Sequence, residues 1–263
     1  MRMRTSWLVQ TNVEPESTSP ALLRRACAAL DTPFFEISVV PRSPVLPEMP
    51  SVDGPFVFHG RTTLLLRALE HPRWRKGVFF DPETFQHAVY TAHYGERMLN
   101  ADARIVSWAE LRAEAHSSDE MLFLKPNDDL KYFTGAVFSF AEAITLHDRL
   151  VSAGVPLSAD SMVAVARPRE IDAEWRLFVV DGKVVTGSMY RPSGDAYVPV
   201  EVRAFAEETA ALWSPAEVFV LDVARSEGAF RVVECNCFNG SRFYLADVER
   251  IVEEVSTHQE VRW

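Results

Sequence analysis

Short apolar blocks alternate with helix signals over the first hundred residues. They predict strands at residues 6–10, 34–40, 56–60 and 77–80, and helices at 19–30 and 61–69. Residues 41–55 are rich in proline and predict a loop. Asp81-Pro82-Glu83 predicts the start of a further helix, with Asp as N-cap and Pro in the first turn. Strands that alternate with helices indicate a parallel α/β unit.

From about residue 120 the pattern changes to paired strands joined by tight turns. We expect strands at residues 121–125, 136–140, 161–166, 174–181, 183–190, 218–224 and 229–236, and helices at 140–153, 200–212 and 241–255. Asp181-Gly182 and Glu227-Gly228 are hairpin turn signals. This second part is therefore α+β, and we expect two domains, residues 1–115 and 116–263.

Three oxygen-bearing side chains lie between apolar neighbours on the second hairpin. Glu234 and Asn236 share one face of their strand because side chains alternate. With the turn at Glu227-Gly228, Asp222 falls opposite residue 233 or 234, and like charges placed so are destabilising. A cation between the acids removes that cost, and such oxygen ligands suit Mg²⁺. The alternative is a solvated acidic face, which the apolar flanks disfavour.

Two lysines flank a polar segment in the middle of the chain. Lys125 ends an apolar strand, and Lys131 lies six residues later in a loop, residues 127–135, that closes with Thr-Gly. Such a loop can offer ammonium charges and backbone N–H groups to phosphates. Taken alone, the segment fits a solvated loop with two surface lysines better.

The first hairpin carries further charges. Glu174 and Arg176 share one strand face, and Arg191 lies at the far end of the partner strand. Arg176 could bind a phosphate or simply pair with Glu174. Arg191 could reach the same cleft.

In this order, the segments resemble the ATP-grasp superfamily over about residues 120–255, and above all its small phage- and bacterial-type members. That family has a lysine at a strand end before a phosphate loop, a hinge strand for adenine, an acid-x-Arg strand with a V-x-G-x-V-V hairpin, and an Asp strand followed by Glu-x-Asn. The matching positions are Lys125-Pro126, residues 163–167, Glu174-x-Arg176 with residues 180–185, Asp222, and Glu234-Cys235-Asn236. The resemblance implies an ATP-grasp fold, with nucleotide between two α+β subdomains, after a Rossmann-like pre-ATP-grasp α/β domain.

The resemblance also implies an ATP- and Mg²⁺-dependent ligase that joins a carboxylate to an amine or similar nucleophile through an acyl phosphate and releases ADP and phosphate. It implies Mg²⁺ ligands at Asp222, Glu234 and Asn236, nucleotide contacts from Lys125, Lys131, Glu174 and the hinge residues Val165, Ala166, Arg167 and Glu170, and phosphoryl neutralisation by Arg176 and Arg191. Two alternatives stay open, namely an ATP-dependent modifier of RNA or protein and a nucleotide-binding regulator without turnover.

Composition narrows the range of partners. The 27 Lys and Arg against 37 Asp and Glu give a net charge of -10, which argues against a broad nucleic-acid surface. No apolar run approaches the roughly 18–20 residues of a membrane span, so we expect no membrane partner. The expected substrates are small-molecule or peptide carboxylates and amines. Three cysteines do not suggest a disulfide framework and favour a cytoplasmic location.

Two minor motifs complete the candidates. His59-Gly60-Arg61, where a strand meets a helix, could bind an anion, although an ordinary turn is the favoured interpretation. Cys235 and Cys237 could clip a metal, although packing is favoured because no second cysteine pair completes a zinc site.

Overall fold

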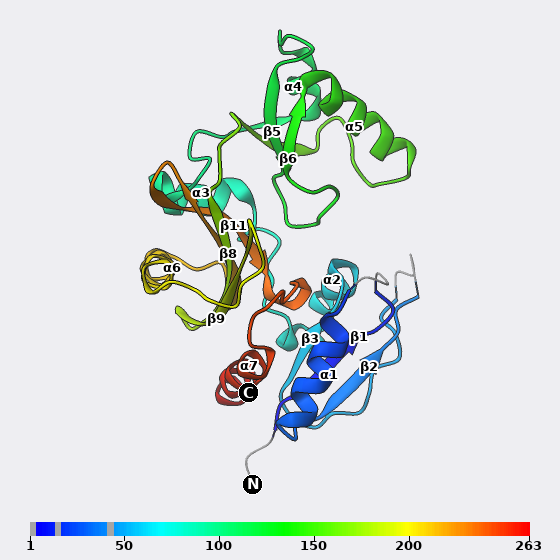
Figure 1. Ribbon diagram of the computed structural model, residues 1–263. Helices are drawn as coiled ribbons and strands as arrows, with labels where there is room; N and C mark the ends of the chain where they lie inside the picture. Colours follow the sequence, from blue (N-terminus) through cyan, green and yellow to red (C-terminus); the bar gives the residue numbers. More distant parts are fainter. Residues whose placement is uncertain (1–3, 14–16, 41–44) are drawn as a thin grey trace.

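The strands of the described residues form three sheets, which follow one another along the molecule (Figure 1). The computed structural model describes residues 4–13, 17–40 and 45–263. The sheet nearest the N-terminus packs beside the central sheet, and the sheet with β5 and β6 lies at the opposite end (Figure 1).

The N-terminal sheet is parallel, with the order β2-β1-β3. Its elements are β1 (Ser6–Gln10), α1 (Ser19–Ala29), β2 (Phe34–Ile37), β3 (Phe56–His59) and α2 (Thr62–Glu70). The parallel pairing confirms the predicted α/β unit, whereas its Rossmann-like character stays a prediction. Of the predicted loop, residues 41–44 lie outside the described residues, and residues 45–55 form neither helix nor strand.

The predicted strand at residues 77–80 is wrong. A 3₁₀ turn, η1 (Trp74–Gly77), stands there, and the following residues join no sheet. The side chain of Asn239 takes the place of a neighbouring strand. Its Oδ1 accepts from the Phe79 N–H at 2.7 Å, and its Nδ2 donates to the Gly77 carbonyl at 3.0 Å. These bonds satisfy the backbone without a ladder.

The next helix begins later than predicted. The Asp81-Pro82-Glu83 segment forms a turn, and α3 runs over His87–Tyr94. Its first N–H groups bind a residue that is distant in the sequence. The Asn127 carbonyl accepts from His87 N at 2.6 Å, and Asn127 Oδ1 accepts from Ala88 N at 3.0 Å. The cap that starts α3 therefore lies on the loop after β5. A short 3₁₀ turn, η2 (Gly95–Arg97), follows.

The second sheet is antiparallel, with the order β4-β7-β5-β6. Its elements are β4 (Arg104–Ser107), α4 (Trp108–Ala113), β5 (Met121–Pro126), β6 (Ala136–Ser139), α5 (Phe140–Ser152) and β7 (Met162–Ala166). The domain boundary near residue 115 stays a prediction. The structure adds that β4, on the N-terminal side of that point, pairs with β7.

The central sheet has the order β11-β10-β8-β9 and consists of the two predicted hairpins. Its elements are β8 (Ala173–Val180), β9 (Lys183–Arg191), α6 (Val200–Leu212), β10 (Val218–Ser226) and β11 (Ala229–Cys237). Both turns lie in the left-handed region, at Asp181-Gly182 and Glu227-Gly228, as such two-residue turns require. One apolar face packs with α6, and the other packs at one end with α7.

The last helix also begins later than predicted. Ser241 follows a 3₁₀ turn, η3 (Phe238–Gly240), and its hydroxyl donates to the Phe238 carbonyl at 2.9 Å. The N-cap is instead Asp247, whose side chain accepts from Arg250 N, and α7 spans Val248–Arg262. Ser241 therefore closes a turn and does not start the helix.

Candidate active site

A row of polar side chains crosses the central sheet. The ladder places Ser188, Arg176, Asp222 and Glu234 directly opposite one another on β9, β8, β10 and β11. Opposed residues of a ladder project from the same face. The predicted cross-strand neighbourhood of Asp222 and Glu234 is therefore confirmed. Three of the four residues are buried, with Asp222 and Ser188 at 0% exposure.

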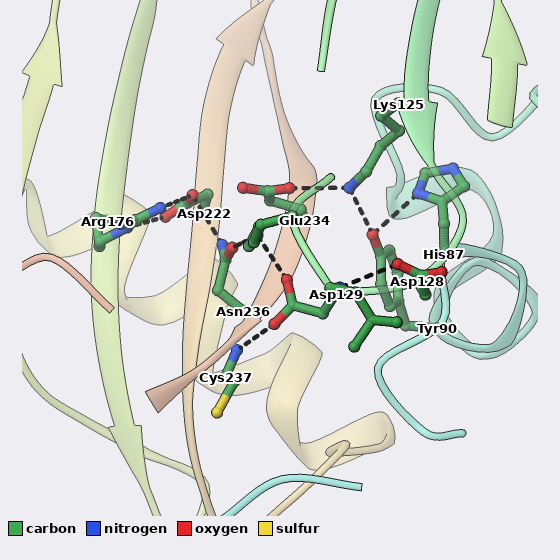
Figure 2. Close-up of polar contacts among 12 residues, drawn as sticks. His87, Tyr90, Lys125, Asp128, Asp129, Arg176, Asp222, Glu234, Asn236 and Cys237 are labelled. Atoms are coloured by element: carbon green, nitrogen blue, oxygen red, sulfur yellow. Dashed lines mark hydrogen bonds and ion pairs between the residues drawn. The ribbon is translucent and has the colours of Figure 1, made fainter. Parts of the chain in front are cut away.

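Side-chain cations flank the two acids of this row, with Arg176 beside Asp222 and Lys125 beside Glu234. Arg176 donates to both carboxylate oxygens of Asp222, from Nε at 2.9 Å and from Nη2 at 2.6 Å (Figure 2). Asn236 Nδ2 adds a third bond to Asp222 at 3.1 Å. Burial raises the pKa of Asp222, and the charge and hydrogen bonds of Arg176 oppose that rise. The like-charge conflict expected from the sequence is thus relieved within the chain itself.

The second sheet delivers two lysines to the same face. Lys125, at the end of β5, donates to Glu234 Oε2 at 2.9 Å. Lys131 donates to Asn236 Oδ1 at 2.5 Å and pairs with Asp129 Oδ1 at 2.5 Å. The two lysines therefore meet the hairpin acids, which favours a binding site over a solvated loop.

The lysines hold Glu234 in its charged form. Burial disfavours the ionised Glu234, but Lys125 and Lys131 together hold the pKa of this carboxyl well below its usual range. Glu234 and Asp129 raise the pKa of Lys131, whose side chain is 52% exposed. Glu234 and Lys131 are therefore both charged at neutral pH.

A second group of polar residues extends the row toward Arg191. Glu174 is only 3% exposed, accepts from the Tyr190 hydroxyl, and lies 3.6 Å from Arg191 Nε. Burial and the nearby Asp222 raise the pKa of Glu174 to about 7, although the hydrogen bond from Tyr190 lowers that pKa. Glu174 therefore pairs with Arg191, whereas Arg176 pairs with Asp222.

Two tyrosines cover the guanidinium of Arg176. The rings of Tyr190 and Tyr244 stack with their centroids 4.9 Å apart. The Arg176 guanidinium carbon lies 5.8 Å from the Tyr190 centroid and 5.1 Å from that of Tyr244. These cation–π contacts help to hold the guanidinium in place beside Asp222.

The hinge residues lie where β7 leads into β8. Val165 and Ala166 are buried within the β7 ladder. Arg167 is exposed and lies 3.3 Å from Asp102, and with Glu170 it lines a cavity of about 350 Å³. Their contact with adenine stays a prediction.

A small cavity lies between the lysines and the central sheet. Its volume is about 100 Å³, and it is lined by Phe85, Tyr90, Lys125, Lys131, Phe133 and Glu234 among others. Small-molecule sites usually enclose roughly 300–1,000 Å³. A nucleotide could enter this cavity only if the loop after Asn127 moved outward.

The predicted magnesium ligands have the right donor chemistry. Asp222, Glu234 and Asn236 lie on one face of the hairpin and carry carboxylate and amide oxygens, which suit Mg²⁺. Arg176 now contacts both oxygens of Asp222, and Asn236 turns its Nδ2 toward that carboxylate. Lys131 now contacts the Asn236 oxygen, so it would have to withdraw before a metal bound there. In the described part of the chain, no group of three or more His, Cys, Asp or Glu side chains could hold a metal. The amide of Asn236 is thus essential to the predicted set.

The two minor motifs are structural. His59 is buried, its Nε2 lies 3.0 Å from the Ser241 carbonyl, and burial lowers its pKa to about 4. Gly60 N donates to the Asn239 carbonyl at 2.8 Å. The favoured interpretation of an ordinary turn fits these bonds. Cys235 and Cys237 are buried free thiols whose pKa values burial raises, as expected for packing residues.

Sequence reasoning missed three polar residues of the site. Tyr90 and His87, on α3, lie beside Lys125 (Figure 2). Asp129, on the loop of residues 127–135, accepts from the Cys237 N–H at 2.9 Å. The contacts of these residues join segments far apart in the sequence, so local patterns gave no signal for them.

Comparison with protein families gives the fold family. A model of the ATP-grasp domain, R2K clade family 3, matches residues 56–255. The chain belongs to this family. The resemblance seen in the sequence is therefore confirmed, as is the ATP-grasp fold. A search among curated proteins finds no match.

Solved structures with the same fold include several ligases. D-cycloserine synthetase DcsG is 17% identical, with a TM-score of 0.61 over 97% of this chain and 99% of that one. The ATP-grasp ligase PsnB, complexed with a phosphomimetic precursor variant, Mg and ADP, is 14% identical, with a TM-score of 0.56 over 98% and 99%. D-alanine–D-alanine ligase from Bacillus anthracis, complexed with ATP, is 13% identical, with a TM-score of 0.54 over 99% and 97%.

ATP and Mg²⁺, the cofactors expected from the sequence, are those of ATP-grasp ligases. The cofactor prediction is confirmed at the level of this ATP-grasp family. None of the helices formed by the described residues has the length and apolar character needed to cross a membrane. The cytoplasmic location stays a prediction.

Proposed function

We propose that this ATP-grasp protein is a ligase that joins a carboxylate to an amine or similar nucleophile through an acyl phosphate, with release of ADP and phosphate. The observation that carries the proposal is the meeting of Lys125 and Lys131 with the row of Arg176, Asp222 and Glu234 at one small cavity. Phosphoryl transfer needs cations held in fixed positions around the phosphates, and this junction supplies them.

In this proposal the lysines bind the phosphates of ATP, and the arginines lie on the acceptor side. Lys125 and Lys131 would hold the phosphates of ATP, with the loop of residues 127–135 as the lid that keeps water from the acyl phosphate. Arg176, fixed by Asp222, and Arg191, beside Glu174, would neutralise the transferred group from the acceptor side. Mg²⁺ held by Asp222, Glu234 and Asn236 would neutralise charge on the β- and γ-phosphates.

Each step of the proposed reaction balances. A carboxylate oxygen attacks the γ-phosphorus, the bond from that phosphorus to the β-phosphate oxygen breaks, and ADP leaves. The nucleophile nitrogen then attacks the acyl carbon, phosphate leaves, and the amine proton passes to solvent. Small-molecule or peptide carboxylates and amines are the proposed substrates.

The remaining parts of the chain have supporting roles in this proposal. Backbone groups of residues 165–167, with Glu170, would contact adenine at the hinge. The N-terminal parallel sheet would act as a Rossmann-like pre-ATP-grasp domain, with residues 1–115 and 116–263 as the two domains. The contacts of α3 with Lys125 and Asn127 support a site to which both proposed domains contribute.

Phosphorus NMR of a reaction mixture tests the proposal. The protein is incubated with ATP, Mg²⁺ and pooled amino acids, peptides and other carboxylates and amines, and each pool that stimulates turnover is divided. ADP and phosphate should form in equal amounts and only with a working acceptor. AMP and pyrophosphate would overturn the mechanism. ATP binding without turnover in any pool would favour a regulator.

A further inference from the structure

A buried hydrogen-bonded chain reaches Lys125 from α3. The Lys125 ammonium donates to the Tyr90 oxygen at 2.9 Å and to Glu234 Oε2 at 2.9 Å. The Tyr90 oxygen lies 3.0 Å from His87 Nδ1 (Figure 2). Tyr90 and His87 are each 1% exposed and Lys125 is 8% exposed. The ammonium thus has one charged partner on β11 and one neutral partner on α3.

The protons in this chain follow from the donors and acceptors present. An ammonium can only donate, so the Tyr90 oxygen accepts from Lys125. The single hydroxyl proton of Tyr90 then points to His87 Nδ1, which must be unprotonated. Burial and the charge of Lys125 lower the pKa of His87 to about 3, so its imidazole is neutral and carries its proton on Nε2. The protons are therefore donated in order from Lys125 to Tyr90 and from Tyr90 to His87, and the chain ends at the buried His87 Nε2, which has no hydrogen-bond partner among the described residues.

The two partners of Lys125 differ in what nucleotide binding does to them. Glu234 belongs to the proposed Mg²⁺ set, so its bond to Lys125 must weaken when metal and phosphate arrive. Tyr90 is neutral, and burial raises its pKa well above the usual range. It can therefore hold the ammonium without cancelling the charge that a phosphate needs. The helix that carries Tyr90 is itself bonded to Asn127, two residues after Lys125.

We propose that Tyr90 is a positioning residue, which keeps the Lys125 ammonium aimed into the nucleotide cavity while its bond to Glu234 is exchanged for a phosphate. This inference rests on the proposed contact between Lys125 and ATP. His87 assists by accepting the Tyr90 proton, so that the hydroxyl oxygen faces the lysine.

Calorimetric titration with ATP and Mg²⁺ tests Tyr90→Phe against a matched control. The phenyl ring keeps the packing but removes the hydrogen bond to a charged group, so ATP affinity should fall about tenfold. Tyr94→Phe is the control, because Tyr94 lies one turn later on α3, is also buried, and donates to the Trp213 carbonyl at 3.0 Å. The control should bind ATP within about twofold of the parent.

A double-mutant cycle separates a positioning role from a structural one. In a Lys125→Ala background, Tyr90→Phe should have no further effect on ATP affinity, because it acts through the lysine. An equal loss in both backgrounds would overturn the inference, as would unchanged affinity in Tyr90→Phe. If Lys125→Ala itself bound ATP like the parent, the lysine contact in the proposed function would also fail. If instead Lys125→Ala weakened binding and Tyr90→Phe did not, only the role of Tyr90 would fail.

Discussion

Removing one charge of the buried pair between Arg176 and Asp222 should strongly destabilise the fold. The pair has two hydrogen bonds, at 2.9 and 2.6 Å, and its side chains are 10% and 1% exposed. Asp222→Asn keeps the shape but leaves a charged guanidinium buried. The ring faces of Tyr190 and Tyr244 offset only part of that loss. We expect the free energy of unfolding to fall by about 3–5 kcal/mol.

Thermal melting measures this loss. For a chain of this size, 1 kcal/mol shifts Tm by about 2–4 °C, so Asp222→Asn should melt about 6–20 °C below the parent. Asp172→Asn is the matched control, because Asp172 and Arg225 lie 3.8 Å apart and both side chains are 54% exposed. Removing that exposed pair should cost at most about 1 kcal/mol.

Replacing both buried partners provides a second arm. Arg176→Met combined with Asp222→Leu leaves no unpaired charge and should recover most of the lost stability. The reasoning is refuted if Asp222→Asn melts together with the exposed control.

Three further variants probe the site and the fold. Lys131→Ala should lower kcat by a larger factor than it lowers ATP affinity, because its ammonium would act after the loop closes. Steady-state kinetics gives kcat and calorimetry gives the affinity; equal losses in the two would contradict this role. Arg191→Ala should bind ATP within about twofold of the parent yet lose at least about tenfold in kcat, because its exposed guanidinium lies on the proposed acceptor side; a loss confined to ATP affinity would contradict that role. His59→Gln should lose less stability than the parent between pH 6.5 and 4. Burial lowers the folded pKa of His59 to about 4, so only the unfolded chain takes up a proton below about 6.5, and the parent's free energy of unfolding falls by up to about 3 kcal/mol. Urea unfolding at the two pH values checks this, and parallel losses would exclude it.

Local signals predicted the acidic hairpin well. The Glu227-Gly228 turn fixes the register of its two strands, so the meeting of Asp222 with Glu234 could be derived from spacing alone. The start of α4 could also be predicted from the sequence, because Ser107 and Glu110 form a capping box. That signal was overlooked.

Contacts between distant segments could not be derived in this way. The start of α3 depends on Asn127, about forty residues later. The helix start predicted at Asp81-Pro82 is wrong because the turn there is not continued as a helix. The predicted strand at residues 77–80 failed for the same reason, since Asn239 binds that backbone from near the end of the chain. A single sequence carries no local trace of such partners.

The attachment of Asn127 to the first turn of α3 also sets where the phosphate loop can bend. Its carbonyl and its side chain are both bonded to α3, so opening must begin at residue 128. At the other end, a Cβ on Gly135 would lie 3.0 Å from the Lys125 Cβ, so the chain there is held against the strand. Any opening is therefore confined to residues 128–134, with Lys131 at the centre, and it must break the hydrogen bond between Asp129 and the Cys237 N–H. In the proposed function, an incoming nucleotide would meet the Lys125 ammonium on its fixed strand first and the Lys131 ammonium on the closing loop second, so the two lysines would separate docking from closure.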